Sequence, residues 1–221
     1  MDFLSHELLN SNTARILREE LLRENNSWED GKSSAGSHAA IVKNNMQLDK
    51  KCKVAEENSR KIINLIRSDS LIKSFALPRK IHGVMFSKAT KGQAYGTHVD
   101  NPYMSTGRSD LSFTIFLSPP ESYQGGELCV QTLQSYEEIK LPAGQIAIYP
   151  STYLHSVKEV KVGTRLACVG WIHSYVSRNE DREILFGLDA GAKGLLAEHG
   201  RSPELDLIFQ AYSNLTRRLG N

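Results

Sequence analysis

Apolar residues recur at helix-like intervals through the first third of the chain. Five of them, separated by polar residues, predict an amphipathic helix near the N-terminus: Leu8, Leu9, Ile16, Leu17 and Leu21. The Gly- and Ser-rich segment WEDGKSSAGSHAA, residues 28–40, predicts a loop. A second amphipathic helix is predicted over 54–67. A further helical turn over 70–77 should stop before Pro78, because helical backbone is disfavoured in the residue that precedes proline.

From about residue 80 the apolar spacing shortens to that of strands. Six short segments rich in β-branched and aromatic residues are separated by turn-forming residues: IHGVMF, SDLSFTIFLS, GELCVQ, EEIKL, QIAIYP and TRLACVGWIHS. Within 109–118, apolar residues alternate with Ser112 and Thr114, which predicts a strand with one buried face. Several strands at this spacing favour a sandwich or jelly roll. The absence of alternating strands and helices argues against a parallel nucleotide-binding sheet.

The tail from about residue 177 returns to a helical pattern. In RSPELDLIFQAYSNLTRRL, Ser202 can cap a helix, Pro203 suits its first turn, and Glu204 favours the positive N-terminal end. An apolar stripe follows at Leu205, Ile208, Tyr212 and Leu215. The stripe either docks on its own domain or forms the interface of a homodimer.

These patterns together predict an α+β protein whose strands form a sandwich or jelly roll. We expect this strand-rich core over residues 78–176. The N-terminal helical region, 1–77, should pack on that core, and a C-terminal helical extension should occupy 177–221.

Composition narrows the class of protein further. The 221 residues are 40% hydrophobic and 24% charged, and their net charge of +2 does not imply nucleic-acid binding. Cys52, Cys129 and Cys168 are odd in number and far apart, which argues against a disulfide framework and suits a reducing compartment. Neither a secretory signal nor a membrane span is visible, so we expect a cytoplasmic protein.

A possible metal-binding pair lies in the segment GTHVDN. His98 and Asp100 are two residues apart, and on a strand such residues point to the same face. One imidazole and one carboxylate can then reach one cation from the same side. This HxD pattern is weak alone, because many strands and loops contain it by chance.

A second candidate group lies in YPSTYLHSVKEVKVGTRLACVGW. The pattern predicts a hairpin in which 155–160 pairs with 164–170 around a loop at 161–163. In that register Glu159 faces Arg165, so Arg165 points to the same side as His155, about four residues or ~13 Å along. A slip of one residue would reverse this orientation.

His98, Asp100 and His155 together have the composition of the facial triad of non-haem Fe(II) oxygenases. Such a triad leaves positions on the metal for a 2-oxo acid and O₂. A structural zinc site would more often contain thiolates. Arg165 can hold the distant carboxylate of the 2-oxo acid, because a guanidinium makes paired hydrogen bonds.

The order HxD, then 55 residues to His155, then ten to Arg165, resembles the prolyl-4-hydroxylase-like branch of the Fe(II)/2-oxoglutarate dioxygenases, and most closely the bacterial PKHD-type hydroxylase family. The resemblance extends over nearly the whole chain. It is carried by AGSHAAIVKNNMQL, SFALPRKIHGVMF, GQAYGTHVDN, RSDLSFTIFLSPPESYQGGELCVQT and IKLPAGQIAIYPSTYLHSV.

The resemblance implies a double-stranded β-helix, or jelly-roll, core over residues 78–176, flanked by the N-terminal and C-terminal helices. It implies an enzyme that hydroxylates a substrate with O₂ and 2-oxoglutarate, releasing succinate and CO₂. It implies iron ligands at His98, Asp100 and His155, 2-oxoglutarate binding at Arg165, and L-ascorbate as an accessory reductant. One departure is Ala89, which lies where many relatives carry a tyrosine. Tyr95 could line the pocket instead.

Other interpretations stay open. The jelly roll could be a non-catalytic binding or sensing module, or a cupin-like enzyme with a different metal. Asp110 is expected to orient its loop, and Trp171 to lie in the core. A group of residues in 28–45 either shapes a substrate entrance or closes the helical layer on the sheet: Trp28, Asp30, Lys43, Asn44 and Asn45.

Overall fold

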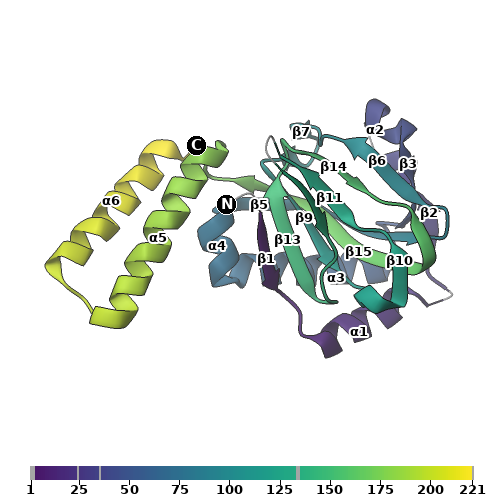
Figure 1. Cartoon of the computed structure of the whole chain (residues 1–221), viewed down its shortest axis with the longest axis horizontal. Coiled ribbons are helices and arrows are strands. Elements are labelled where there is room, and N and C mark those ends of the chain that lie inside the picture. The colour runs from purple at the N-terminus through teal and green to yellow at the C-terminus, as the bar shows by residue number, and fades with distance from the viewer. Residues whose placement is uncertain (1–2, 24, 35, 133–134, 221) are drawn as a thin grey trace.

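Two antiparallel sheets form the centre of the molecule, with helices outside them (Figure 1). The computed structural model describes residues 3–23, 25–34, 36–132 and 135–220. In the order of their pairing, the strands of the major sheet are β1 (Leu4–Glu7), β13 (Gln145–Pro150), β9 (Leu111–Phe116), β15 (Val160–Ser174), β5 (Pro78–Thr90), β4 (Met46–Leu48) and β2 (Trp28–Asp30), with β10 (Tyr123–Gly125) paired to β15.

The minor sheet lies opposite the major sheet and completes the jelly roll. Its strands, in order, are β12 (Tyr136–Ile139), β11 (Leu128–Gln131), β14 (Leu154–Val157), β6 (Ala94–His98) and β3 (Lys43–Asn44). A separate ribbon joins β7 (Tyr103–Met104) and β8 (Gly107–Arg108). The helices are α1 (Ser11–Leu21), α2 (Ser37–Ile41), α3 (Lys53–Ser68), α4 (Ser70–Ala76), α5 (Asn179–His199) and α6 (Pro203–Leu219), with 3₁₀ turns η1 (Gly31–Ser34) and η2 (Pro120–Ser122).

Strand β15 shows how the major sheet separates two environments. Leu166 and Cys168 belong to the same buried apolar cluster as Ile62 and Ile66 of α3. Arg165, one position away, points to the other face and lines a cavity between the sheets. Side chains alternate across a strand, so one face packs on helices while the other supplies the cavity.

The same alternation corrects our expectation for β9. The strand is confirmed, but all six of its residues are buried, so its polar positions do not face solvent. Phe113 and Ile115 belong to the apolar cluster, whereas Ser112 and Thr114 line the cavity. A polar face on a strand can thus be turned toward a buried site as well as toward water.

The N-terminal third is less helical than its apolar spacing predicts. Residues 4–7 form β1, which pairs with β13, and α1 begins only at Ser11, so Leu8 and Leu9 precede the helix. The expected loop at 28–40 contains β2, η1 and α2, although Ala35 lies outside the described residues. These short strands form because they pair with strands that are distant in sequence. Local residue propensity therefore does not predict them.

The other predicted helices are confirmed. α3 spans Lys53–Ser68, and α4 ends at Ala76, where Leu77 has φ 44° immediately before Pro78. In α6, the Ser202 hydroxyl accepts a hydrogen bond from the Leu205 amide at 3.2 Å, as expected of a cap.

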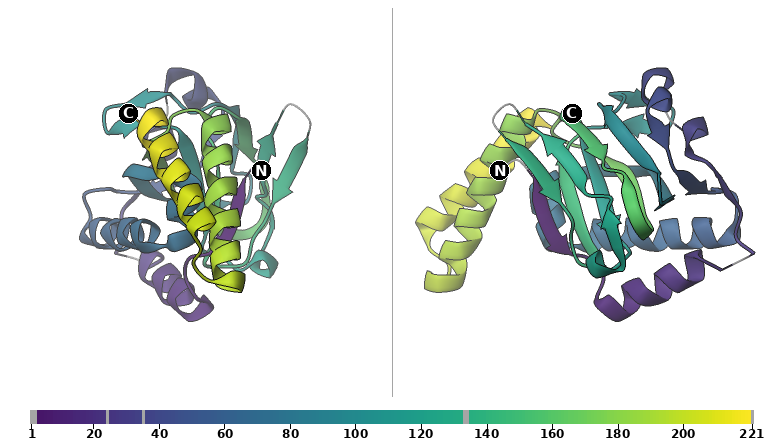
Figure 2. Two further views of the ribbon diagram at one scale, coloured as in Figure 1. Left: turned by 90° about the vertical axis from the view of Figure 1, so that its left-hand side faces the viewer. Right: turned by 45° about the vertical axis from the view of Figure 1, so that its right-hand side comes forward.

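The C-terminal helices α5 and α6 form a hairpin that extends from one end of the sheets (Figures 1 and 2). The rings of Phe75 in α4 and Phe186 in α5 meet edge to face, with centroids 5.6 Å apart. Ser74 of α4 also donates a hydrogen bond to Asp189 of α5. α6 packs on α5 of the same chain, and Leu205 of its apolar stripe is buried.

No helix among the described residues is long and apolar enough to cross a membrane. The division of the chain at 77 and 176 stays a prediction, although strands from the first 48 residues join both sheets.

The apolar face between α3 and the major sheet should dominate stability. Ile66 is 0% exposed, and Ile66→Ala should lower the free energy of unfolding by about 2–5 kcal/mol, because it removes buried methyl groups and leaves a cavity. Leu65→Ala is the matched control, since Leu65 is 37% exposed, and should cost less than about 1 kcal/mol. Urea unfolding followed by circular dichroism measures both. Equal losses in the two variants would contradict this assignment of the core.

Candidate metal centre

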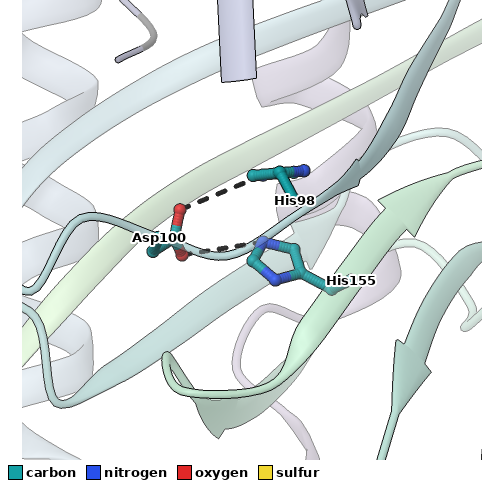
Figure 3. A group of neighbouring side chains, drawn as sticks. All are labelled: His98, Asp100 and His155. Atoms are coloured by element: carbon teal, nitrogen blue, oxygen red, sulfur yellow. Dashed lines mark ion pairs between the residues drawn. The ribbon is translucent and has the colours of Figure 1, made fainter. Parts of the chain in front are cut away.

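His98, Asp100 and His155 lie together at the wall of the cavity (Figure 3). One Asp100 oxygen lies 4.0 Å from Nε2 of His98, and the other lies 3.6 Å from Nε2 of His155. The three possible ligand atoms are all within 4.8 Å of one another. The described residues contain no other group of three or more His, Cys, Asp or Glu side chains in such an arrangement.

The two histidines come from neighbouring strands and are oriented by backbone carbonyls. His98 ends β6 and is paired directly with His155 of β14. Nδ1 of His98 contacts the Gly96 carbonyl at 2.9 Å, and Nδ1 of His155 contacts the Tyr153 carbonyl at 3.0 Å. A carbonyl can only accept, so each Nδ1 carries the proton and each Nε2 is free to bind a cation.

The electrostatic environment favours neutral imidazole. Burial, helped by neighbouring His155, lowers the pKa of His98 to about 4. Neutral imidazole is the form that binds metals. Asp100 follows β6, so the parity argument for an HxD pair on one strand applies only in part.

Asp100 is held by groups that the sequence did not identify as part of the site. One of its oxygens accepts hydrogen bonds from Trp171 Nε1 at 2.8 Å and from the Ser112 hydroxyl at 2.6 Å. The Ser112 hydroxyl is also 2.7 Å from that of Ser151. Trp171 was expected in the core, but it is only partly buried and lines the cavity. The alternation along β15 that includes Arg165 was the available signal.

A bulge in β6 adds a tyrosine to the site. His155 pairs with His98 and Val157 pairs with Tyr95, so three residue steps on β6 oppose two on β14. The extra residue brings Tyr95 and His98 to the same side, where their rings stack with centroids 3.8 Å apart. The expectation that Tyr95 lines the pocket is confirmed.

Arg165 lies in the same cavity as the triad, on the opposite sheet. Its side chain is 3% exposed, and Nε donates to the Gly126 carbonyl at 2.8 Å. Burial lowers the pKa of the guanidinium. No carboxylate among the described residues forms an ion pair with it, so the group is a buried cation without a partner anion.

The predicted hairpin that placed Arg165 beside His155 is wrong. β14 pairs with β11 and β6, whereas residues 160–174 form one continuous strand that pairs with β5, β9 and β10. Gly163, the expected turn glycine, has φ 80° but lies within β15 opposite Tyr123. Arg165 and His155 therefore face each other across the sandwich, because strands adjacent in sequence joined different sheets.

The cavity between the sheets has a volume of about 670 Å³. Ala89 lies directly opposite Arg165 on β5 and lines it. Tyr149 of β13 also lines the cavity, and burial raises the pKa of its phenol, helped by the charge of Asp100. A neutral phenol thus lies in the pocket that contains both Asp100 and Arg165, despite the alanine at position 89.

Asp110 has a different role from Asp100. Its two oxygens accept hydrogen bonds from Arg108 Nε and from the Ser174 amide, each at 2.8 Å. It joins the loop before β9 to the end of β15, as expected of a residue that orients its loop.

The donor set fits a non-haem Fe(II) ion. Two imidazole nitrogens and one carboxylate approach a common point at the edge of an open cavity. This composition is that of the facial triad, in which three further positions stay open to other ligands.

Comparison with known proteins agrees with this geometry. A family model described as the 2OG-Fe(II) oxygenase superfamily matches residues 84–173. Two PKHD-type hydroxylases of Prochlorococcus marinus, from strains MIT 9313 and MIT 9303, are each 65% identical to this chain over 100% of both sequences.

Solved structures show the same fold at low identity. A prolyl-4-hydroxylase of Pseudomonas putida covers 78% of this chain and 92% of its own, with a TM-score of 0.55 and 17% identity. A Trichoplax adhaerens prolyl hydroxylase, in complex with a peptide fragment of the hypoxia inducible factor oxygen degradation domain, covers 83% and 86%, with a TM-score of 0.57 and 15% identity.

The fold and the site therefore define a member of the 2OG-Fe(II) oxygenase superfamily. Within it, the chain belongs to the PKHD-type hydroxylase family and is a 2-oxoglutarate-dependent dioxygenase. This membership favours the enzyme over the alternatives of a non-catalytic jelly-roll module and a cupin-like enzyme.

The bond from Trp171 to Asp100 should hold the carboxylate in its metal-binding orientation. Trp171→Phe removes the N–H donor but keeps an aromatic ring, and should weaken Fe(II) binding ~10- to 100-fold. Trp28→Phe is the control, because Trp28 lies outside the cavity, where Lys88 Nζ is 4.3 Å from its ring centre. Anaerobic titration with Fe(II), and the visible spectrum of the Co(II)-substituted protein, measure the effect. Unchanged affinity and spectrum in Trp171→Phe would show that Asp100 needs no such support.

Proposed function

We propose that His98, Asp100 and His155 bind Fe(II), that Arg165 binds the distal carboxylate of 2-oxoglutarate, and that the enzyme hydroxylates a C–H bond of a substrate held in the rest of the cavity. The substrate would be a peptide or protein side chain or a small metabolite, and succinate and CO₂ would be released. The observation that carries this proposal is the convergence of two oriented imidazoles and one carboxylate in a cavity that also contains a buried, unpaired guanidinium.

The chain's own residues would orient the reactants. When bound, iron supplies the activation of O₂ that is coupled to oxidative decarboxylation of the 2-oxo acid. The carbonyls of Gly96 and Tyr153 keep both Nε2 atoms available. The hydrogen bonds from Trp171 and Ser112 occupy one oxygen of Asp100, which leaves the other to face the metal.

The environment of Arg165 supports the proposed co-substrate site. A buried charge is costly unless it is paired, so a cation at 3% exposure favours an anionic ligand. The Gly126 carbonyl holds Nε, which leaves the terminal nitrogens to form paired bonds to a carboxylate. Gly126 also admits the arginine, because a Cβ there would lie 2.9 Å from Arg165 Cδ. Tyr149 could add a hydroxyl donor in place of the tyrosine that Ala89 replaces.

We further propose an accessory reductant, a cellular location and an oligomeric state. Ascorbate as an accessory reductant rests on family resemblance. A cytoplasmic location rests on Cys52, Cys129 and Cys168, which are free thiols. A homodimer also stays a prediction, and the net charge of +2 does not suggest a nucleic-acid partner.

Loss of any proposed iron ligand should abolish turnover. His98→Ala, Asp100→Ala and His155→Ala should each stop Fe(II)-dependent release of succinate from 2-oxoglutarate, because each leaves two protein ligands where three are the minimum. The circular dichroism spectrum should change little. His199→Ala, at an exposed histidine outside the cavity, is the control. Succinate release and anaerobic iron titration are the measurements. Full turnover by the His155→Ala protein would remove that residue from the site.

Arg165→Lys should raise the KM for 2-oxoglutarate. A point charge replaces a planar fork, and loss of one charge-assisted interaction worth ~2–3 kcal/mol corresponds to ~30- to 150-fold. Arg67→Lys, at an exposed position on α3, is the matched control and should leave KM unchanged. Initial rates at varied 2-oxoglutarate test this. If KM is also unchanged in Arg165→Lys, another cation holds the co-substrate.

A further inference from the structure

Lys43 is a second buried cation in the active-site cavity. It lies on β3, is 5% exposed and lines the same cavity as the iron ligands. Its ammonium donates a hydrogen bond to the Ser34 hydroxyl at 2.9 Å. No acidic side chain in the described part of the chain forms an ion pair with it. The charges of Asp30 and Asp100 act on it only from a distance.

The position of Lys43 relative to the iron ligands is set by Tyr95. Lys43 and Tyr95 are directly opposed on β3 and β6. The ammonium lies 5.0 Å from the centre of the Tyr95 ring, and the same ring stacks on His98 with centroids 3.8 Å apart. Tyr95 therefore contacts both Lys43 and a proposed iron ligand, so a group bound at Lys43 would lie close to the metal centre.

The charges around the cavity are unbalanced. Among its described lining residues, Asp100 is the only carboxylate, whereas Lys43, Lys50 and Arg165 are cationic. Iron would occupy Asp100, and the co-substrate would neutralise Arg165. Lys43 and Lys50 would then remain without an anion. Lys50 is exposed to solvent, whereas Lys43 is buried.

A purely structural role does not account for this arrangement. If Lys43 only closed the helical layer on the sheet, an uncharged side chain would serve without the cost of desolvating an ammonium. That cost is visible in the pKa of Lys43, which burial, and next the charge of Lys50, lower to about 8. A bound anion would offset it.

We propose that the Lys43 ammonium, held in place by the Ser34 hydroxyl, forms a subsite for a carboxylate of the primary substrate, so that the molecule hydroxylated by this enzyme is an organic anion. This inference rests on the proposed function and adds a substrate class to it. The Ser34 hydroxyl donates to the Gly31 carbonyl at 2.9 Å and accepts from Lys43, so it orients the ammonium. The other N–H groups of that ammonium can form charge-assisted hydrogen bonds to a single negative charge. Arg165, on the opposite sheet, is left to the co-substrate.

The Mn(II)-substituted enzyme saturated with 2-oxoglutarate offers a direct test. Trifluoroacetate serves as the anion probe, trifluoroacetamide as its neutral counterpart, and paramagnetic broadening of the ¹⁹F line reports binding close to the metal. The wild-type complex should broaden the trifluoroacetate line saturably and leave the amide nearly unaffected. Lys43→Met should weaken trifluoroacetate binding at least ~10-fold, as expected for loss of a charge-assisted pair.

Two further variants separate charge from folding. Ser34→Ala keeps the ammonium and should weaken trifluoroacetate binding by a smaller factor, because only one hydrogen bond to Lys43 is lost. Lys32→Met removes an exposed lysine from η1, outside the cavity lining, and should leave binding unchanged.

The possible failures are distinguishable. Equal broadening in wild type and Lys43→Met, or equal broadening by anion and amide, would overturn the subsite. So would a loss of 2-oxoglutarate affinity in Lys43→Met as large as that in Arg165→Lys, because Lys43 would then serve the co-substrate. If wild type fails to bind Mn(II), seen by electron paramagnetic resonance before any probe is added, the proposed function is wrong and the subsite is overturned with it.

Discussion

The alternation of side chains across the major sheet is the constraint on which the rest of this structure depends. On β15 and β9, one set of positions belongs to the apolar cluster that also contains residues of α3, and the other set faces the space between the sheets. The first set makes the sheet stable without contributing to the site. The second set can therefore be polar, as Ser112, Thr114 and Arg165 are, because the core no longer needs those positions.

The charged side chains of the cavity come from both sheets and are either held by neighbouring groups or left without a partner of opposite charge. Asp100 receives hydrogen bonds from Trp171 and Ser112, so a buried carboxylate is kept in one orientation. Arg165 and Lys43 have single hydrogen bonds to neutral oxygens and no paired carboxylate among the described residues. Buried cations of this kind favour anionic ligands, and this preference is the basis of the two anion sites proposed at Arg165 and Lys43.

Much of the fold could be predicted from local patterns, and the site residues from their chemistry. The helix at 53–68, the cap at Ser202 and the central strands follow from apolar spacing and turn residues. The HxD pair is a weak signal alone, but its combination with His155 and Arg165 at the spacing of this family predicts the site. The short strands β1 to β4 could not be found in this way, since they exist only through pairing with strands that are distant in sequence.

The sequence by itself determined which donor groups are present: two imidazoles, a carboxylate and a guanidinium with the order and spacing of this family. Only the tertiary structure decided how they meet. It placed His155 and Arg165 on opposite sheets, turned Tyr95 toward His98 through a bulge, and brought Trp171 to Asp100. The physical reason is that side-chain identity is local, whereas strand pairing and register are set by contacts between distant segments, and one inserted residue reverses a face.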